Sequence, residues 1–74
     1  MKKVIKARIS DELLDDIEDF FGKNEGHRND PVFLALVDRI QGQVVELVIT
    51  GNDAFEKIDD NYWLPDCCWQ EVSE

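Results

Sequence analysis

The chain has 74 residues, of which 17 are acidic and 8 are basic, so its formal net charge is −9. A chain of this length has room for one small core, and we expect residues 1–74 to form a single domain. A charge this negative disfavours direct binding to nucleic acid and favours binding to a basic protein surface, with solubility as the simpler explanation.

Residues 2–9 alternate between two sides, which predicts a half-buried β-strand. Ile5, Ala7 and Ile9 fall on one side, and the other side is mostly basic. This start carries four bases and no acid, whereas residues 10–74 carry four bases and 17 acids. The basic side could contact phosphate. Because the rest of the chain is acidic, we favour a solvated side that neutralises acids of the same protein.

An amphipathic helix is predicted to follow, with Ser10 as its N-cap and Gly22 as its end. Apolar residues from Leu13 to Phe21 recur at helical spacing, and no base lies between Ser10 and Gly22. The acids of the outer face are Asp11, Glu12, Asp15, Asp16, Glu18 and Asp19. Like charges four residues apart cost a few tenths of a kcal/mol each. The stripe is therefore either a solvated face near the N-terminal bases or a surface that binds a partner.

A polar loop and a second, shorter helix come next. His27 lies in a loop rich in Gly and Asn, where a single histidine is expected at the surface. Because no Cys or His pair at metal spacing accompanies it, we expect no metal site. Asp30 followed by Pro31 predicts an N-cap and the first helical position, with Gly42 ending the helix.

The last third of the chain is predicted to be mainly β-structure. Residues 43–50 are rich in β-formers, Gly51-Asn52-Asp53 is a turn, and residues 54–58 return as the partner strand. Residues 62–64 predict a short strand, Pro65-Asp66 a helical turn, and residues 69–72 an edge strand or extended tail.

Residues 61–69 hold both tryptophans, the tyrosine and both cysteines, so this segment is expected to close the fold. Trp63 either anchors the sheet to the helices or serves as an exposed interface anchor. Cys67 and Cys68 are adjacent and predicted to be reduced, structural thiols, which favours the cytoplasm. No secretory signal or membrane span is expected, since no apolar run approaches about 18 residues.

The predicted fold class is α+β: an N-terminal strand, an amphipathic helix, a short second helix and a three- to four-stranded antiparallel meander. The expected core residues are Ile5, Ile9, Leu14, Ile17, Phe21, Phe33, Leu36, Val45, Leu47, Ile49, Phe55, Trp63 and Trp69. The sequence holds no nucleophile elbow, phosphate-binding loop or zinc-protease motif. We therefore expect no catalytic residue, no cofactor and no enzymatic activity.

Four motifs in the second half are Gly42-x-Val44-x-Glu46-x-Val48, Phe55-x-x-Ile58-Asp59-Asp60, Tyr62-x-Leu64-Pro65 and Trp69-x-x-Val72. Together they resemble small phage and bacterial proteins with a Src-homology-type small barrel. The resemblance implies that the last strand follows a short turn after a Leu-Pro step, and that residues 10–41 are a helical insertion. Families of that kind mostly bind proteins or nucleic acids.

A basic strand followed by a Ser-capped helix, over residues 2–21, also resembles the start of ribbon-helix-helix repressors. That resemblance implies a second helix over 32–40 and places Lys2, Lys6 and Arg8 in the DNA major groove. An antitoxin could combine such a strand with an acidic arm. The long loop between the helices departs from that family, and the acidic charge is opposite to that of a DNA binder.

We therefore expect a non-enzymatic protein-interaction module, encoded by a phage or mobile element, that inhibits a host protein by covering its basic, nucleic-acid-binding surface. The expected partner-binding residues are the six helix acids and Trp63. The alternative is a ribbon-helix-helix-type DNA-binding repressor or an antitoxin. Because so short a chain often needs a disulfide, a metal or a partner subunit, a homodimer is a further expectation.

Overall fold

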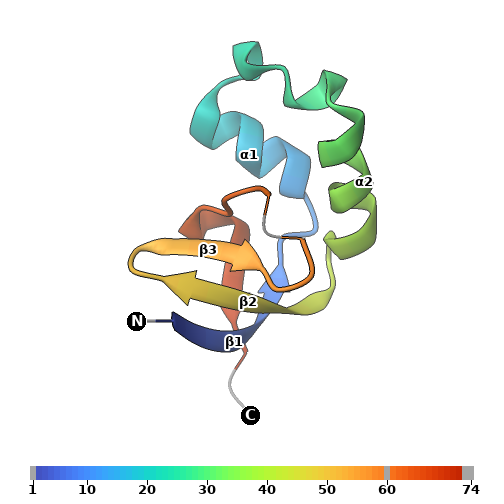
Figure 1. The fold of residues 1–74 in the computed structure, drawn as a ribbon. Helices are drawn as coiled ribbons and strands as arrows, with labels where there is room; N and C mark the ends of the chain where they lie inside the picture. The colour runs from blue at the N-terminus through green and yellow to red at the C-terminus, as the bar shows by residue number, and fades with distance from the viewer. Residues whose placement is uncertain (1, 60, 73–74) are drawn as a thin grey trace.

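The computed structural model describes residues 2–59 and 61–72, and it confirms the α+β class. Figure 1 shows two helices on one side of an antiparallel sheet. The elements in chain order are β1 Lys2–Ile9, α1 Leu13–Phe21, α2 Pro31–Ile40, β2 Val44–Thr50, β3 Asp53–Glu56 and β4 Trp69–Glu71. Three short 3-10 turns complete them: η1 Lys23–Glu25, η2 His27–Asn29 and η3 Asp66–Cys68.

The sheet has the strand order β3-β2-β1-β4. β1 and β2 pair from Lys2 opposite Thr50 to Arg8 opposite Val44, and β2 and β3 form the predicted hairpin. Gly51 begins the hairpin turn with φ +63°, a left-handed conformation that glycine adopts without strain. β4 crosses to the far edge and pairs with β1 at residues 7–9. β1 therefore has a neighbour on each side within its own chain.

The alternation predicted for β1 is confirmed. Ile5, Ala7 and Ile9 are buried beneath the helices, whereas Lys6 and Arg8 are exposed on the outer side of the sheet. This period of two follows from the pleat, which turns successive side chains to opposite faces.

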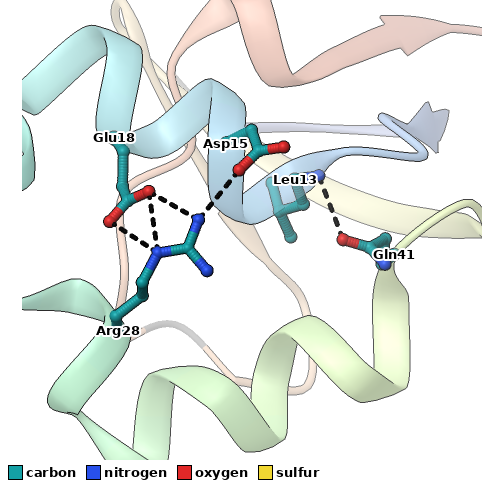
Figure 2. A network of polar contacts seen from close by, with 5 residues as sticks. All are labelled: Leu13, Asp15, Glu18, Arg28 and Gln41. Atoms are coloured by element: carbon teal, nitrogen blue, oxygen red, sulfur yellow. Dashed lines mark hydrogen bonds and ion pairs between the residues drawn. The ribbon is translucent and has the colours of Figure 1, made fainter.

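The start of α1 differs from the prediction. The Ser10 hydroxyl does accept a hydrogen bond, from the backbone N–H of Glu12 at 3.0 Å, but the helix begins only at Leu13. The N–H of Leu13 donates instead to the side-chain oxygen of Gln41, at 3.1 Å, just after α2 (Figure 2). A residue far away in sequence thus satisfies one of the free donors at the start of α1.

The predicted start of α2 is confirmed. Asp30 Oδ1 accepts from the backbone N–H groups of Val32 and Phe33, at 3.0 and 3.2 Å, and Pro31 occupies the first turn. Proline fits there because its missing N–H would have no partner inside the helix.

About half of the expected core is fully buried. Ile5, Ile9, Ile17, Phe33, Leu36 and Leu47 are confirmed as buried, and the other expected members are half-buried. The prediction did not include several residues that are fully buried: Ala7, Leu13, Val37, Ile40, Ala54, Leu64 and Cys68. Leu13 is the first residue of α1 and Ile40 the last residue of α2, and both belong to the buried core cluster.

The prediction of a strand over residues 62–64 is wrong. Trp63 forms only an isolated bridge with Phe55, and the Leu64 N–H donates to the Ala54 carbonyl at 2.8 Å. The helical turn predicted at Pro65-Asp66 is confirmed as η3, and the edge strand after it as β4. Asp60, part of one resemblance motif, lies outside the described residues. In the described ranges, no helix has both the length and the apolar character needed to cross a membrane.

Candidate functional site

The outer side of α1 and the turn before it form an acidic surface. Leu13 and Ile17 point into the core, which turns Glu12, Asp15 and Asp19 to the solvent, and Asp16 is half-buried. Asp11 is also exposed, and its carboxylate lies so close to Gly42 that an added Cβ there would meet Oδ1 at 2.7 Å. We call Asp11, Glu12, Asp15, Asp16 and Asp19 the acidic stripe.

Glu18 does not belong to this stripe, so its placement on the exposed outer face is wrong. Its side chain is only 4% exposed and accepts hydrogen bonds from Arg28 of η2 (Figure 2). Arg28 Nε donates to both carboxylate oxygens at 3.1 Å, and Arg28 Nη2 donates to Oε1 at 2.9 Å. A fork of this kind satisfies a buried carboxylate and raises the pKa of Arg28.

Arg28 also reaches the acidic stripe itself. Its Nη2 lies 3.0 Å from Asp15 Oδ1, so one base partly neutralises two acids of α1 (Figure 2). The sequence places no base inside the helix, but the fold supplies one from the loop that follows it. The other four acids of the stripe make no ion pair with any residue in the described ranges: Asp11, Glu12, Asp16 and Asp19. These four are the unneutralised part of the stripe.

A pair of aromatic rings, the exposed Phe20 and the half-buried Trp63, adjoins the C-terminal end of the acidic stripe. Phe20 is 52% exposed, although its spacing had placed it with the apolar side of the helix. Its ring meets Trp63 edge to face, with centroids 5.4 Å apart, and Trp63 meets Phe21 in the same way at 5.6 Å. Asp16 precedes Phe20 by one helical turn. The fold thus brings the predicted Trp63 to the predicted helix acids.

Phe20 is the site residue that sequence reasoning missed. Consecutive residues of a helix point about 100° apart, so Phe20 and Phe21 cannot both face the centre of the core. Phe21 is on the side of Leu14 and Ile17, which leaves Phe20 at the boundary beside Asp16. Two adjacent aromatics at the end of an amphipathic helix were the signal that could have found it.

A second group of rings holds Trp63 in place. His27, predicted at the surface, is half-buried between Phe21 and Phe33, with ring centroids 5.4 and 5.1 Å away. Phe33 in turn contacts Tyr62 at 5.2 Å, and the Tyr62 hydroxyl donates to Asp30 Oδ2 at 2.6 Å. These contacts fix the segment that carries Trp63 against both helices.

The described residues also include side chains of the types that bind metal ions. In residues 2–59 and 61–72, no three side chains of His, Cys, Asp or Glu lie together in a way that could hold a metal ion. Cys67 is exposed, Cys68 is buried, and both are free thiols.

The predicted basic side of the N-terminal strand lies on the outer face of the sheet, and its end approaches the acidic stripe, because Arg8 and Asp11 line the same depression. Arg8 and Lys6 project from the outer face of the sheet, and Lys2 starts the same strand. A ribbon-helix-helix protein pairs this strand with the same strand of a second copy. Here β2 pairs along one edge of β1 from Lys2 to Arg8, and β4 pairs with the other edge at residues 7–9 only.

No protein-family model, no curated protein and no solved structure matches this chain. The chemistry of its own residues therefore carries the functional argument.

Proposed function

We propose that this protein is a non-enzymatic interaction module whose acidic stripe and adjoining aromatic pair, Phe20 and Trp63, bind a basic surface of another protein. The observation that carries the proposal is their juxtaposition: carboxylates without ion-pair partners within the described ranges lie beside a ring that is 52% exposed. Aromatic residues and arginine are enriched at protein–protein interfaces, where a few of them supply most of the binding energy.

The chemistry of this surface favours arginine over lysine in the partner. A guanidinium can stack on an aromatic face and donate two hydrogen bonds to one carboxylate, and an ammonium group cannot make that planar fork. Asp16 and Phe20 are one helical turn apart, so one arginine side chain could contact both. Closely spaced carboxylates also resemble phosphates to a protein that grips nucleic acid.

The biological setting we propose follows from that resemblance. The module would act as a phage or mobile-element inhibitor that occupies the nucleic-acid-binding surface of a host protein. Its free thiols fit a reducing cytoplasm. The repressor or antitoxin alternative has less support, because the exposed helix face is acidic and because β2 already pairs along β1, with β4 pairing at residues 7–9 of its other edge.

Oligoarginine and oligolysine peptides of equal length are the probes for a first test, with affinity measured by titration calorimetry at low and moderate salt. Wild-type protein should bind oligoarginine more tightly, and salt should weaken both complexes. The variant Glu12→Lys/Asp19→Lys should bind oligoarginine about tenfold more weakly or worse. Asp15 is left unchanged because it pairs with Arg28.

The matched control is Asp38→Lys/Asp53→Lys, which changes the net charge by the same amount at exposed positions outside α1. It should keep most of the affinity. Phe20→Ser should lower the affinity for oligoarginine and leave that for oligolysine nearly unchanged. Equal losses in the two double variants would mean that net charge alone attracts the peptide, and the proposed site would be wrong.

A further inference from the structure

The turn η3 holds two thiols side by side. The Sγ atoms of Cys67 and Cys68 are 3.8 Å apart. The turn is closed by the Cys68 N–H, which donates to the Pro65 carbonyl at 2.9 Å, and by Trp69 Nε1, which donates to the Leu64 carbonyl at 3.1 Å. The Cys68 carbonyl accepts from the Ser10 N–H at 2.9 Å. These hydrogen bonds hold the backbone that positions the two sulfur atoms, without any ligand being bound.

The two thiols differ in access. Cys67 is exposed beside a depression of about 430 Å³ whose lining includes Arg8, Ser10 and Asp11. Cys68 is fully buried, and burial raises the pKa of its thiol. An electrophile from solvent therefore reacts with the Cys67 thiol first. Cys68 then reacts with the same group after that group is bound to Cys67.

The distance between the sulfurs selects the geometry of the ligand. Two sulfurs each about 2.3 Å from one centre and about 3.8 Å apart subtend roughly a tetrahedral angle, whereas a linear ion would hold them about 4.6 Å apart. A disulfide would need a separation of about 2.05 Å in a small strained ring. A structural zinc ion needs four ligands, and the described ranges offer no third ligand here.

We propose that Cys67 and Cys68 form a binding site for monosubstituted trivalent arsenicals, whose pyramidal arsenic takes two thiols and keeps its third substituent. The Cys67 thiol adds to R–As=O and forms an S–As bond, which leaves one hydroxyl on arsenic. The Cys68 thiol then displaces that hydroxyl, and its proton leaves with it as water. Two S–H bonds become two S–As bonds, arsenic stays trivalent, and no oxidant is needed.

Phenylarsine oxide and the full-length native protein provide the test, with the product weighed as an intact chain by mass spectrometry. One adduct per chain should form, at the mass of the reagent less one water. Excess monothiol should leave it in place, and a dithiol should remove it. In Cys67→Ser, whose change is at the surface, monothiol should strip any adduct at a concentration lower by about tenfold or more, because the intramolecular second bond is gone.

Cys68→Ala removes the other sulfur and should behave in the same way, provided that its circular dichroism spectrum is native. If the variant does not fold, alkylation of wild-type protein replaces it: after reaction with phenylarsine oxide, both cysteines should resist iodoacetamide added in urea, where both are alkylated in the untreated protein. Protection of Cys67 alone would overturn the proposal. So would an adduct that retains the water, or one that monothiol strips from wild type as readily as from Cys67→Ser.

Discussion

Asp30 uses each oxygen of one carboxylate for a different contact. Oδ1 caps α2 through the N–H groups of Val32 and Phe33, and Oδ2 accepts from the Tyr62 hydroxyl at 2.6 Å. Hydrogen bonds to the ionised form, the one from Tyr62 first, hold the pKa of Asp30 below its ordinary 3.8. The same bond to Asp30 raises the pKa of Tyr62 above its ordinary 10.0.

Titration of the only tyrosine tests this contact. Followed by the ultraviolet absorbance of tyrosinate, Tyr62 should ionise above pH 10.0 in wild type, and Asp30→Asn should lower its pKa toward that value. The stabilising effect of the raised tyrosine pKa is present below pH 10.0 and lost as pH rises through the folded-state value. The stabilising effect of the lowered Asp30 pKa is present above pH 3.8 and is lost as pH falls through the pKa of Asp30 in the folded state. An unchanged Tyr62 titration in the variant would contradict the contact.

The two contacts of Asp30 also show what sequence can and cannot supply at this scale. The cap was predictable because Asp30 directly precedes Pro31. Tyr62 is 32 positions away, so no local pattern connects the two. Glu18 is a second example. Its spacing from Leu14 and Phe21 puts it at the edge of the buried side of α1, but its carboxylate can be buried only because Arg28, from the following loop, pairs with it.

At the scale of elements, one ion pair joins α2 to β3. Arg39 donates to both oxygens of Glu56, with Nη1 to Oε2 at 2.6 Å, and Glu56 is only 2% exposed. The Arg39 side chain is 42% exposed, so solvent screens part of the interaction. Without Arg39, the Glu56 carboxylate would be a buried charge with no cation beside it.

Replacing Arg39 by Met should therefore lower the free energy of unfolding by about 1–3 kcal/mol, which urea denaturation measures. Arg39→Lys keeps the charge but loses the two-pronged geometry, so it should fall between Met and wild type. Arg39→Met/Glu56→Gln should recover part of the loss, because an amide costs less to bury than a carboxylate. A loss of only a few tenths of a kcal/mol in Arg39→Met would show that water already solvates Glu56.

Strand order is the part of the fold that the sequence could not supply. Each main element was predictable from local periodicity, as with β1 and its alternating Ile5, Ala7 and Ile9. The pairing of β4 with β1 joins Ile9 to Trp69 and depends on how the whole chain packs. The acidic stripe was predictable in the same local way, whereas its contact with Trp63 through Phe20 depends on the loop that Tyr62 and Asp30 hold.

At the scale of the whole molecule, charge is distributed unevenly. Arg28, Arg39 and Lys57 each lie beside a glutamate, whereas α1 keeps several acids without an ion-pair partner in the described ranges. The net charge of −9 therefore acts mainly as repulsion across a small body, and repulsion of this kind destabilises the compact state. Salt screens it, because the Debye length falls from about 30 Å at 0.01 M to about 3 Å at 1 M.

The free energy of unfolding should consequently rise with sodium chloride, by about 1 kcal/mol or less over this range.

The two double variants test the same repulsion. Glu12→Lys/Asp19→Lys and Asp38→Lys/Asp53→Lys each take the net charge from −9 to −5, since each substitution changes it by two. Both should be more stable than wild type at low salt and respond less to added salt. The α1 variant should change more, because it also removes like-charge neighbours one helical turn apart, whereas its two helix-dipole effects oppose each other, one cation lying at each end of α1. Urea titrations at several salt concentrations measure both effects. If wild-type stability falls as salt is added, attraction between the acidic and basic sides outweighs repulsion, and the acidic stripe is engaged within its own chain, so that it is not available to a partner.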